Sequence, residues 1–410
     1  MAIGMAFPLI VNAQVSDTIQ LTIEDARSRL LAHNLSLLAE QFNVSDAEAD
    51  AVQARVWNNP NFVWNSDMYS IEKNEYLNYK NQVLVQLEMM VPFTGRISKA
   101  TRVADLNVEE QKLNLENTIR DLLFAFATQY NGLAIAQERA KYFREVAQAY
   151  DRLIEAAEMN EAVGNFSGSE VVRLKSERMS IQAHMLEIDR GILEGMAHMR
   201  TMLYYRENVH LDLRIKDDTL RELKGLDVLL AELPTHRPDY KAALLRVDIS
   251  EADLRLQRAL VMPDVKMGYQ PLDRGSNYVR PYQGIVVEVP LVLFDRNQGP
   301  VKRARNAIDR SRLEVLNKEN EIRNELFSTY QGLLNAQTML AAYTPEFLAS
   351  VEKVKTEATL NYNSRNLSIL EYIDLQRIYV QTMEDYLTVK GFYLDSKEGL
   401  NYVTGQTLFK

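Results

Sequence analysis

The sequence predicts a mainly helical protein built from a duplicated helix–strand–strand–long helix–helix unit, with strands suited to a membrane β-barrel. Three observations lead to this prediction. Alternating strand patterns run directly into long helical segments with heptad-like spacing. The landmarks of this order occur twice, about 200 residues apart. The strands are apolar on one face and polar in several positions on the other.

The junction between strand and helix is clearest in residues 282–300, YQGIVVEVPLVLFDRNQGP. Ile285, Val287 and Val289 alternate with residues that point to the opposite face, as in a β-strand. Pro290 ends regular pairing because it has no N–H to donate. A heptad-like helical run starts at about Val301, so a short strand leads into a very long helix.

Composition limits the classes of protein that this chain can be. The 410 residues are 46% hydrophobic and 25% charged, which is typical of a folded protein. The formal net charge of −9 gives no electrostatic case for binding nucleic acid or an anionic membrane surface. The chain has no cysteine, which excludes disulfides, thiolate metal sites and a cysteine nucleophile. No apolar run reaches the roughly 18 residues of a transmembrane helix.

The first 14 residues, MAIGMAFPLIVNAQ, resemble the apolar core and cleavage site of a signal peptide, without its basic start. We interpret residues 1–14 as a signal-peptide remnant and favour export. The alternative is a frayed apolar tail.

The first repeat is predicted over residues 15–206. One helix with a Thr22–Asp25 capping pair runs to Trp57, and a β-hairpin over 60–92 follows. A helical hairpin over 96–205 comes next, with no proline between Pro92 and Pro234. Its first arm, at about 65 residues, would be about 100 Å long. Gly164, Asn165, Phe166 and Ser167 reverse the chain.

The second repeat is predicted over residues 234–400, with a β-hairpin at 263–293 and a helical hairpin at 300–400. Val289-Pro290 corresponds to Val91-Pro92, and Asn366-Leu367-Ser368 corresponds to Asn165-Phe166-Ser167. An inter-repeat segment, 207–233, joins the halves, and residues 401–410 form a tail.

The apolar faces of the strands predict contact with lipid. Four strands cannot close a barrel, and an open edge in lipid would leave backbone groups unpaired, so several chains must share one barrel. The alternative is an ordinary hairpin packed on soluble helices. The predicted lipid-facing positions are Phe62, Trp64, Val83, Val85, Leu87, Ile285, Val287 and Val289.

From Leu21 to about Gly405 the sequence resembles the TolC-like outer-membrane efflux factors. The most specific segments are VPLVLFDRNQGPVKRA (289–304), HRPDYKAALLRVDISEADLRLQRALVMPDV (236–265) and NLSILEYIDLQ (366–376). The PLxxFDRNxG form is most similar to the heavy-metal, CusC/CzcC-like branch. Many members of that branch carry an acylated N-terminal cysteine; because this chain has none, we expect no lipid anchor of that kind.

The resemblance implies a homotrimer in the outer membrane of a Gram-negative bacterium. Twelve strands would form a β-barrel, continued by a periplasmic α-helical barrel. The implied partners are a periplasmic adaptor (membrane fusion) protein, an inner-membrane transporter of the RND type and outer-membrane lipid, without nucleic acid. The implied function is the passive, gated exit duct of a tripartite efflux pump for small molecules or metal ions.

The resemblance also implies two kinds of functional residue at the turns of the helical hairpins. The turns would contact the adaptor through Gly164, Asn165, Phe166, Ser167, Asn366, Leu367 and Ser368. Glu371 and Asp374 share a helix face at a spacing of three and would form an acidic ring that favours cations. The other predicted gate residues are Tyr362, Arg365, Glu170 and Arg173, and an Arg173–Asp374 contact across the gate is a hypothesis.

The sequence predicts no enzyme, cofactor or metal site. It has no phosphate-binding loop, no GxSxG motif and no HExxH frame. A cluster that includes Met179, Met185, Met199 and His198 has the ligand types of copper, but methionine at this spacing is more often core filler. The alternative function is a soluble periplasmic coiled-coil adaptor or scaffold without a pore.

Overall fold

The computed structural model describes residues 18–66, 68–71, 74–76, 83–161, 167–215, 223–274 and 280–409. The predicted signal-peptide remnant and the turn residues Gly164, Asn165 and Phe166 lie outside these ranges. None of the helices in the described ranges combines the length and the apolar character needed to cross a membrane.

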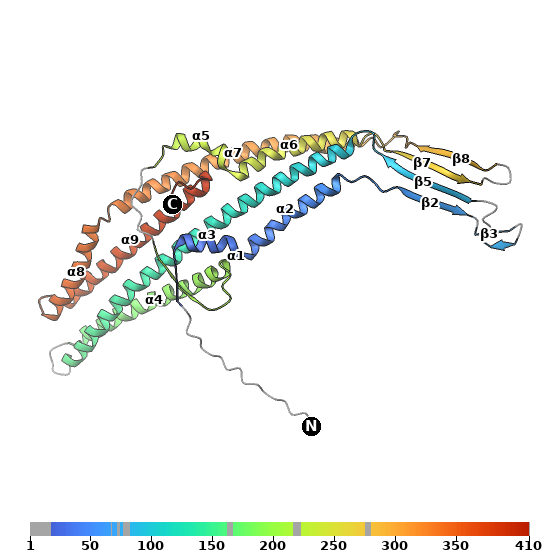
Figure 1. The fold of residues 1–410 in the computed structure, drawn as a ribbon. Coiled ribbons are helices and arrows are strands. Elements are labelled where there is room, and N and C mark those ends of the chain that lie inside the picture. Colours follow the sequence, from blue (N-terminus) through green and yellow to red (C-terminus); the bar gives the residue numbers. More distant parts are fainter. Residues whose placement is uncertain are drawn as a thin grey trace, which may run out of the picture. The chain divides into compact units, whose positions relative to one another are not determined.

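The fold is mainly helical (Figure 1). The strands are β1 (Thr18–Leu21), β2 (Asn61–Ser66), β3 (Tyr69–Ser70), β4 (Glu75–Tyr76), β5 (Val83–Val91), β6 (His210–Leu213), β7 (Val265–Asp273) and β8 (Tyr282–Glu288). The helices are α1 (Ile23–His33), α2 (Leu35–Ala54), α3 (Arg96–Glu161), α4 (Gly168–Met202), α5 (Leu226–His236), α6 (Pro238–Ala259), α7 (Gln298–Ala341), α8 (Pro345–Asn363) and α9 (Ile369–Thr404). The predicted first arm of about 65 residues is α3, with 66 residues.

The chain divides into two compact units that interleave along the sequence. Unit 1 comprises residues 1–38, 118–236 and 323–410, and unit 2 comprises residues 39–117 and 237–322. The long helices α3 and α7 contribute residues to both units. Unit 1 holds the helical hairpins, and unit 2 holds the larger sheet.

Unit 1 contains a short parallel sheet that the sequence analysis did not predict. Strand β6 lies in the predicted inter-repeat segment and pairs with β1 near the start of the described chain. The Tyr130 hydroxyl on α3 donates to the Leu21 carbonyl at 2.8 Å and accepts from the Arg214 N–H at 3.2 Å. The paired strands are therefore fastened to α3 by a buried side chain.

The predicted helix from Thr22 to Trp57 is interrupted at Asn34, so this prediction was wrong. Asn34 has an extended ψ of 115°, and its N–H still donates to the Leu30 carbonyl of α1. Its Oδ1 accepts from the Leu37 N–H at 3.0 Å and caps α2. Its Nδ2 donates to the Met202 carbonyl of α4 at 3.0 Å. Asn34 ends one helix and starts the next because a distant helix end holds its side chain.

The first arm of the second hairpin is also interrupted, between α7 and α8. Thr344 caps α8 by accepting from the Phe347 N–H at 3.1 Å, and Pro345 occupies the first turn. Proline has no N–H to continue the hydrogen bonds of a preceding helix but fits the start of a new one. Helix α9 continues to Thr404, and Gly405 ends it with a φ of 67°.

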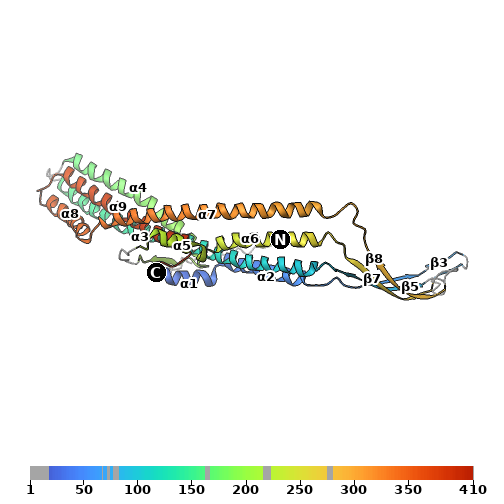
Figure 2. The same ribbon diagram turned by 90° about the horizontal axis from the view of Figure 1, so that it is seen from above.

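Unit 2 contains one four-stranded antiparallel sheet in the order β2-β5-β7-β8, whose strands lie side by side in Figure 1 and overlap in the turned view of Figure 2. The two predicted β-hairpins meet through β5 and β7, where Met89 pairs with Met267. Helices α2, α3, α6 and α7 follow or precede these strands. Ion pairs join neighbouring helices within the unit, including Arg55–Asp105 at 2.7 Å and Arg246–Glu110 at 2.6 Å.

Candidate functional site

The sheet of unit 2 exposes its apolar face. Its register places Phe62 opposite Leu87 and Trp64 opposite Val85, with Tyr269 beside Leu87 and opposite Ile285. These cross-strand neighbours share one face. Phe62 is 68% exposed and Ile285 is 78% exposed. An antiparallel sheet of a water-soluble protein would place such a face against its core.

The opposite face of the same sheet is polar and less exposed. Lys266 on β7 forms ion pairs with Glu88 on β5 at 3.2 Å and with Glu288 on β8 at 2.8 Å. Gln86, 9% exposed, donates to Glu88 at 2.7 Å. At Gly268 an added Cβ would lie 3.1 Å from the Gln86 amide nitrogen, so the glycine leaves room for that side chain. The sheet is therefore the reverse of one in a water-soluble protein. The polar side chains form ion pairs and hydrogen bonds with one another on one face, and the apolar side chains are exposed on the other.

The predicted lipid-facing positions fall into three groups in the structure. Phe62, Trp64, Leu87, Ile285 and Val287 lie on the exposed apolar face, and Val85 lies on it half-buried. Val289 follows the end of β8 and is 49% exposed. Val83 differs from the rest because it is only 8% exposed within the chain.

The second candidate region is the turn end of unit 1, which we define as residues 362–374 with residues 167–177. Helix α8 ends there in a Schellman motif. The Asn366 N–H donates to the Asn361 carbonyl at 2.9 Å, and the Arg365 N–H donates to the Tyr362 carbonyl at 3.0 Å. Arg365 has a φ of 60°, a conformation that usually belongs to glycine.

Both hairpins resume with the same capping box. The Ser368 N–H donates to Glu371 at 2.9 Å, and the Ser167 N–H donates to Glu170 at 3.0 Å. Each serine hydroxyl also contacts its glutamate, at 2.7 Å and 3.2 Å. The matching boxes agree with the sequence repeat, and they give both glutamates a local role in starting α9 and α4. These hydrogen bonds lower the pKa of Glu371 below its usual value, so its carboxylate stays ionised.

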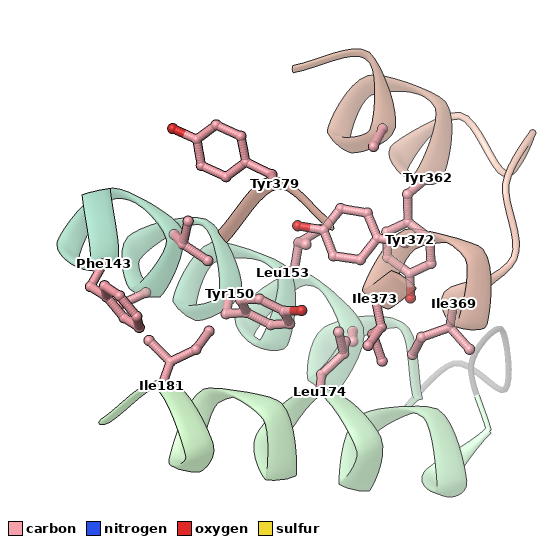
Figure 3. Close-up of a cluster of buried hydrophobic side chains, with 14 of the residues drawn as sticks. Phe143, Tyr150, Leu153, Leu174, Ile181, Tyr362, Ile369, Tyr372, Ile373 and Tyr379 are labelled. Atoms are coloured by element: carbon pink, nitrogen blue, oxygen red, sulfur yellow. The ribbon is translucent and has the colours of Figure 1, made fainter. Parts of the chain in front are cut away.

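The predicted gate residues differ in exposure. Glu371, Asp374, Arg365 and Arg173 are exposed, and Glu170 is half-buried. Tyr362 is 7% exposed. Its ring stacks on Tyr372 with centroids 4.9 Å apart, and burial raises the pKa of Tyr362 to about 12. Figure 3 shows both rings within the core of the turn end.

That core connects the two hairpins within unit 1. Tyr150 on α3 packs edge-on against Tyr372 on α9, with centroids 6.0 Å apart. Leu153 from α3 and Leu174 from α4 belong to the same cluster (Figure 3). This hydrophobic core therefore supports the turns. The turn residues are Ser167, Asn366 and Ser368, which are exposed, and Leu367, which is half-buried.

Arg173 and Asp374 form no ion pair among the described residues of this single chain, so the hypothesised contact across the gate stays a prediction about neighbouring copies. One helical turn further on, Arg377 on α9 forms a two-pronged ion pair with Glu177 on α4. The sequence analysis missed this pair. The repeat gave no signal for it, because at the offset of 201 that relates the two capping boxes Glu177 corresponds to Ile378 and Arg377 to Ser176.

A groove of about 450 Å³ adjoins this ion pair between α3, α4 and α9. Phe143, Glu177, His184, Arg377 and Glu384 are among the residues that line it. In the part of the chain that the structure describes, no group of three or more histidine, aspartate or glutamate side chains could hold a metal ion. Of the methionines noted in the sequence, Met199 is buried in the core, and Met179 is 70% exposed.

The amino-acid sequence is similar to those of known proteins. Residues 26–190 match the outer membrane efflux protein family. The chain is 23% identical over 392 residues to the cobalt-zinc-cadmium resistance protein CzcC of Cupriavidus metallidurans, covering 94% of this chain and 90% of that protein.

Several solved structures have the same fold. CusC superposes with a TM-score of 0.74 at 15% identity, covering 94% of this chain and 92% of CusC. The MtrE outer membrane channel of Neisseria gonorrhoeae gives a TM-score of 0.71 at 14% identity, covering 94% and 89%. VceC of Vibrio cholerae gives 0.70 at 15% identity, covering 94% and 96%. The findings together favour an efflux channel over a soluble adaptor.

Proposed function

Because this chain is related to the TolC-like outer membrane efflux proteins, we propose that it is the outer-membrane channel of a tripartite efflux pump. It acts as a passive, gated exit duct, and the energy for transport comes from a partner. One observation carries the proposal: the sheet exposes its apolar face and pairs its polar side chains on the other. That arrangement suits a wall with lipid outside and water inside.

A single chain is not a complete wall. Strands β2 and β8 each have one neighbour in the described sheet, so both outer edges have backbone groups without strand partners. Such edges are not tolerated in lipid. We propose that three copies pair edge to edge into a twelve-stranded barrel in the outer membrane. The long helices would continue this barrel as a periplasmic helical duct.

The turn end of unit 1 is the proposed periplasmic entrance. Its exposed turns, with Ser167, Asn366, Leu367 and Ser368, are the proposed contact with a periplasmic adaptor. Gly164, Asn165 and Phe166 remain proposed members of this contact from the sequence. The third partner is an inner-membrane transporter of the RND type, which selects the substrate.

Glu371 and Asp374 are the proposed selectivity residues at this entrance. Three copies would bring six carboxylates around one opening and favour cations over anions. The name of CzcC attaches cobalt, zinc and cadmium to that relative. Divalent cations are therefore the first substrates to test. Tyr362, which is buried, would support the entrance by packing rather than by lining it.

Neutralising the acids should reduce the cation preference of the reconstituted channel. Single-channel recordings in a planar bilayer should give a reversal potential closer to zero for Glu371→Gln with Asp374→Asn than for the parent. Glutamine retains a capping side chain, so the start of α9 should persist. The matched control is Glu346→Gln, an acid in the first turn of α8. An unchanged reversal potential in the variant would contradict the proposal that these acids select cations. The absence of channel activity in the parent protein would contradict the proposed function.

The pH dependence of the same recordings follows from the lowered pKa of Glu371. A carboxyl with a lowered pKa in the folded state keeps its charge as the pH falls through the usual value near 4.5. The contribution of Glu371 to cation preference should therefore persist at pH 4.5 and disappear only at lower pH. Ser368→Ala removes one of its hydrogen bonds and should move this loss to higher pH.

The Glu177–Arg377 pair links α4 to α9 and should favour the closed gate. Arg377→Ala should increase the open probability by a factor of about two to five, because exposed ion pairs contribute little. The matched control is Arg190→Ala on α4, whose partner Glu194 lies on the same helix. An open probability that both variants leave unchanged would show that the pair has no role in gating.

A further inference from the structure

We propose that residues 291–305 form a phospholipid anchor, in which Leu291, Leu293 and Phe294 enter the hydrocarbon and the cations that follow bind the headgroups of anionic phospholipids. This inference rests on the proposed function, because it assumes that the sheet lies in a membrane. It concerns a segment outside the regular strands and assigns it a binding role of its own.

The apolar side chains of this segment are fully presented to the surroundings. Leu291 is 80% exposed, Leu293 is 62% exposed and Phe294 is 89% exposed. They follow β8 directly in the sequence, in a turn where the Leu293 N–H donates to the Leu291 carbonyl at 2.9 Å. The apolar surface already proposed to contact lipid is therefore followed, past Pro290, by exposed apolar side chains before the first charged residue, Asp295.

The lengths of the strands explain why an extension is needed. A strand that crosses a membrane in a barrel has about 9 to 11 residues. Strands β5 and β7 have nine residues, but β8 has only seven and β2 only six. At about 3.3 Å per residue, β8 spans roughly 23 Å before tilt, which is less than the apolar band of about 25 Å. The exposed apolar residues after Val289 would cover the part of the apolar band that β8 does not span.

The base of this segment is held in place by hydrogen bonds. Asn297, with a φ of 55°, donates to the Gln257 carbonyl of α6 at 2.8 Å. Its own N–H donates to Asp295 at 3.0 Å, and the Gln298 side chain accepts from the Arg296 N–H at 2.7 Å. The apolar side chains are therefore presented by a fixed loop, which lowers the entropy cost of binding.

Four cations follow the apolar residues, after a single acid, Asp295. Arg296, Lys302, Arg303 and Arg305 are exposed, and none of them forms an ion pair among the described residues. No aspartate or glutamate stands between positions 296 and 308, although the whole chain carries a net charge of −9. An apolar segment followed by unpaired cations matches the layers of a phospholipid surface, with hydrocarbon first and phosphate next.

The first repeat presents a smaller version at the same end of the sheet. Phe93, 66% exposed, follows Val91-Pro92 as Leu291 follows Val289-Pro290. Strands β5 and β8 both pair antiparallel with β7, so they run in the same direction and their last residues leave the sheet together. Each chain therefore has two apolar contacts at this level.

Spin labels on single cysteines test the apolar part, since the parent sequence has no cysteine. Ile285→Cys, Leu293→Cys and Leu316→Cys would be labelled in the full-length protein in phospholipid vesicles. Collisions with oxygen report lipid, and collisions with a water-soluble nickel complex report water. The label at Leu293 should collide mainly with oxygen, as at Ile285. The label at Leu316, which is exposed about 27 Å along α7 from the start of that helix, should collide mainly with the nickel complex.

The outcomes separate this inference from the proposed function. The anchor is overturned if the label at position 293 is accessible to nickel, or if protein shields it from both reagents. Lipid contact of the label at position 285 in the same experiment would still support the proposed channel. A water-exposed label at 285 overturns the proposed function as well. Lipid contact at both positions supports the anchor.

Brominated lipids test the charged part. Phe294→Trp in a Trp57→Phe, Trp64→Phe background gives one fluorophore, quenched by brominated phosphatidylglycerol or phosphatidylcholine. The anionic lipid should be preferred by about fivefold or more. Lys302→Gln, Arg303→Gln and Arg305→Gln together should abolish the preference, whereas Lys141→Gln, Arg190→Gln and Lys353→Gln should retain it. Equal quenching by both lipids in the parent overturns the binding of anionic lipid by these cations, because both lipids carry a phosphate and only phosphatidylglycerol has a net negative charge.

Discussion

Replacing Ile285 by arginine is expected to prevent assembly of the protein in the membrane. Ile285 is 78% exposed on the apolar face of the sheet. An arginine on the lipid face of a barrel costs about 2 to 4 kcal/mol near the bilayer centre. Three copies would multiply this cost within one barrel. The amount of heat-resistant oligomer recovered from membranes should fall at least tenfold.

The neighbouring residue provides a matched control. Val286 is half-buried on the polar face, and it pairs with Gly268. Val286→Arg introduces the same side chain one position along the same strand, towards Gln86 and Glu88 rather than lipid. It should assemble at close to parent levels. Equal loss in the two variants, or equal tolerance, would contradict the assignment of the faces.

Replacing Tyr372 by alanine is expected to destabilise the turn end of unit 1 by about 3 to 5 kcal/mol. Tyr372 is fully buried, and its ring contacts Tyr362 on α8 and Tyr150 on α3. The substitution leaves a cavity where the two hairpins meet (Figure 3). Local opening should increase the rate of proteolysis in the α8–α9 turn by about a hundredfold or more.

Two controls separate packing from other effects of this substitution. Tyr372→Phe keeps the ring and should change the rate of proteolysis much less than the alanine variant does. Leu370→Ala truncates a neighbouring side chain that is 57% exposed and should have little effect. A parent-like rate for Tyr372→Ala would show that the tyrosine cluster does not hold the hairpins together.

Local features of the candidate site were predictable from the sequence. The serine and glutamate of each capping box are three residues apart, so the starts of α4 and α9 needed no tertiary information. The two faces of the strands were likewise visible in the alternation around Ile285. Barrel closure by three chains remains a proposal, because the sequence shows the unpaired edges but not their partners.

Contacts between distant residues were not predictable in the same way. The sequence suggested Arg173 with Asp374, but the ion pair forms between Glu177 and Arg377, one turn further along. A shift of one helical turn leaves the hydrophobic pattern unchanged, so periodicity cannot choose between the two pairs. The sequence predicted Tyr362 as a gate residue, but it could not show that the ring is buried against Tyr372.

The sequence by itself determined the repeat, the order of the β-hairpin and the helical hairpin in each half, the two faces of the sheet and the capped helix starts. The faces of the sheet and the helix starts depend on residues within one or two turns of one another. The tertiary structure alone decided the break at Asn34, the pairing of β1 with β6 and the link between the hairpins through Arg377. Each of these depends on groups far apart in the chain whose hydrogen bonds and charges meet only after the helices have packed.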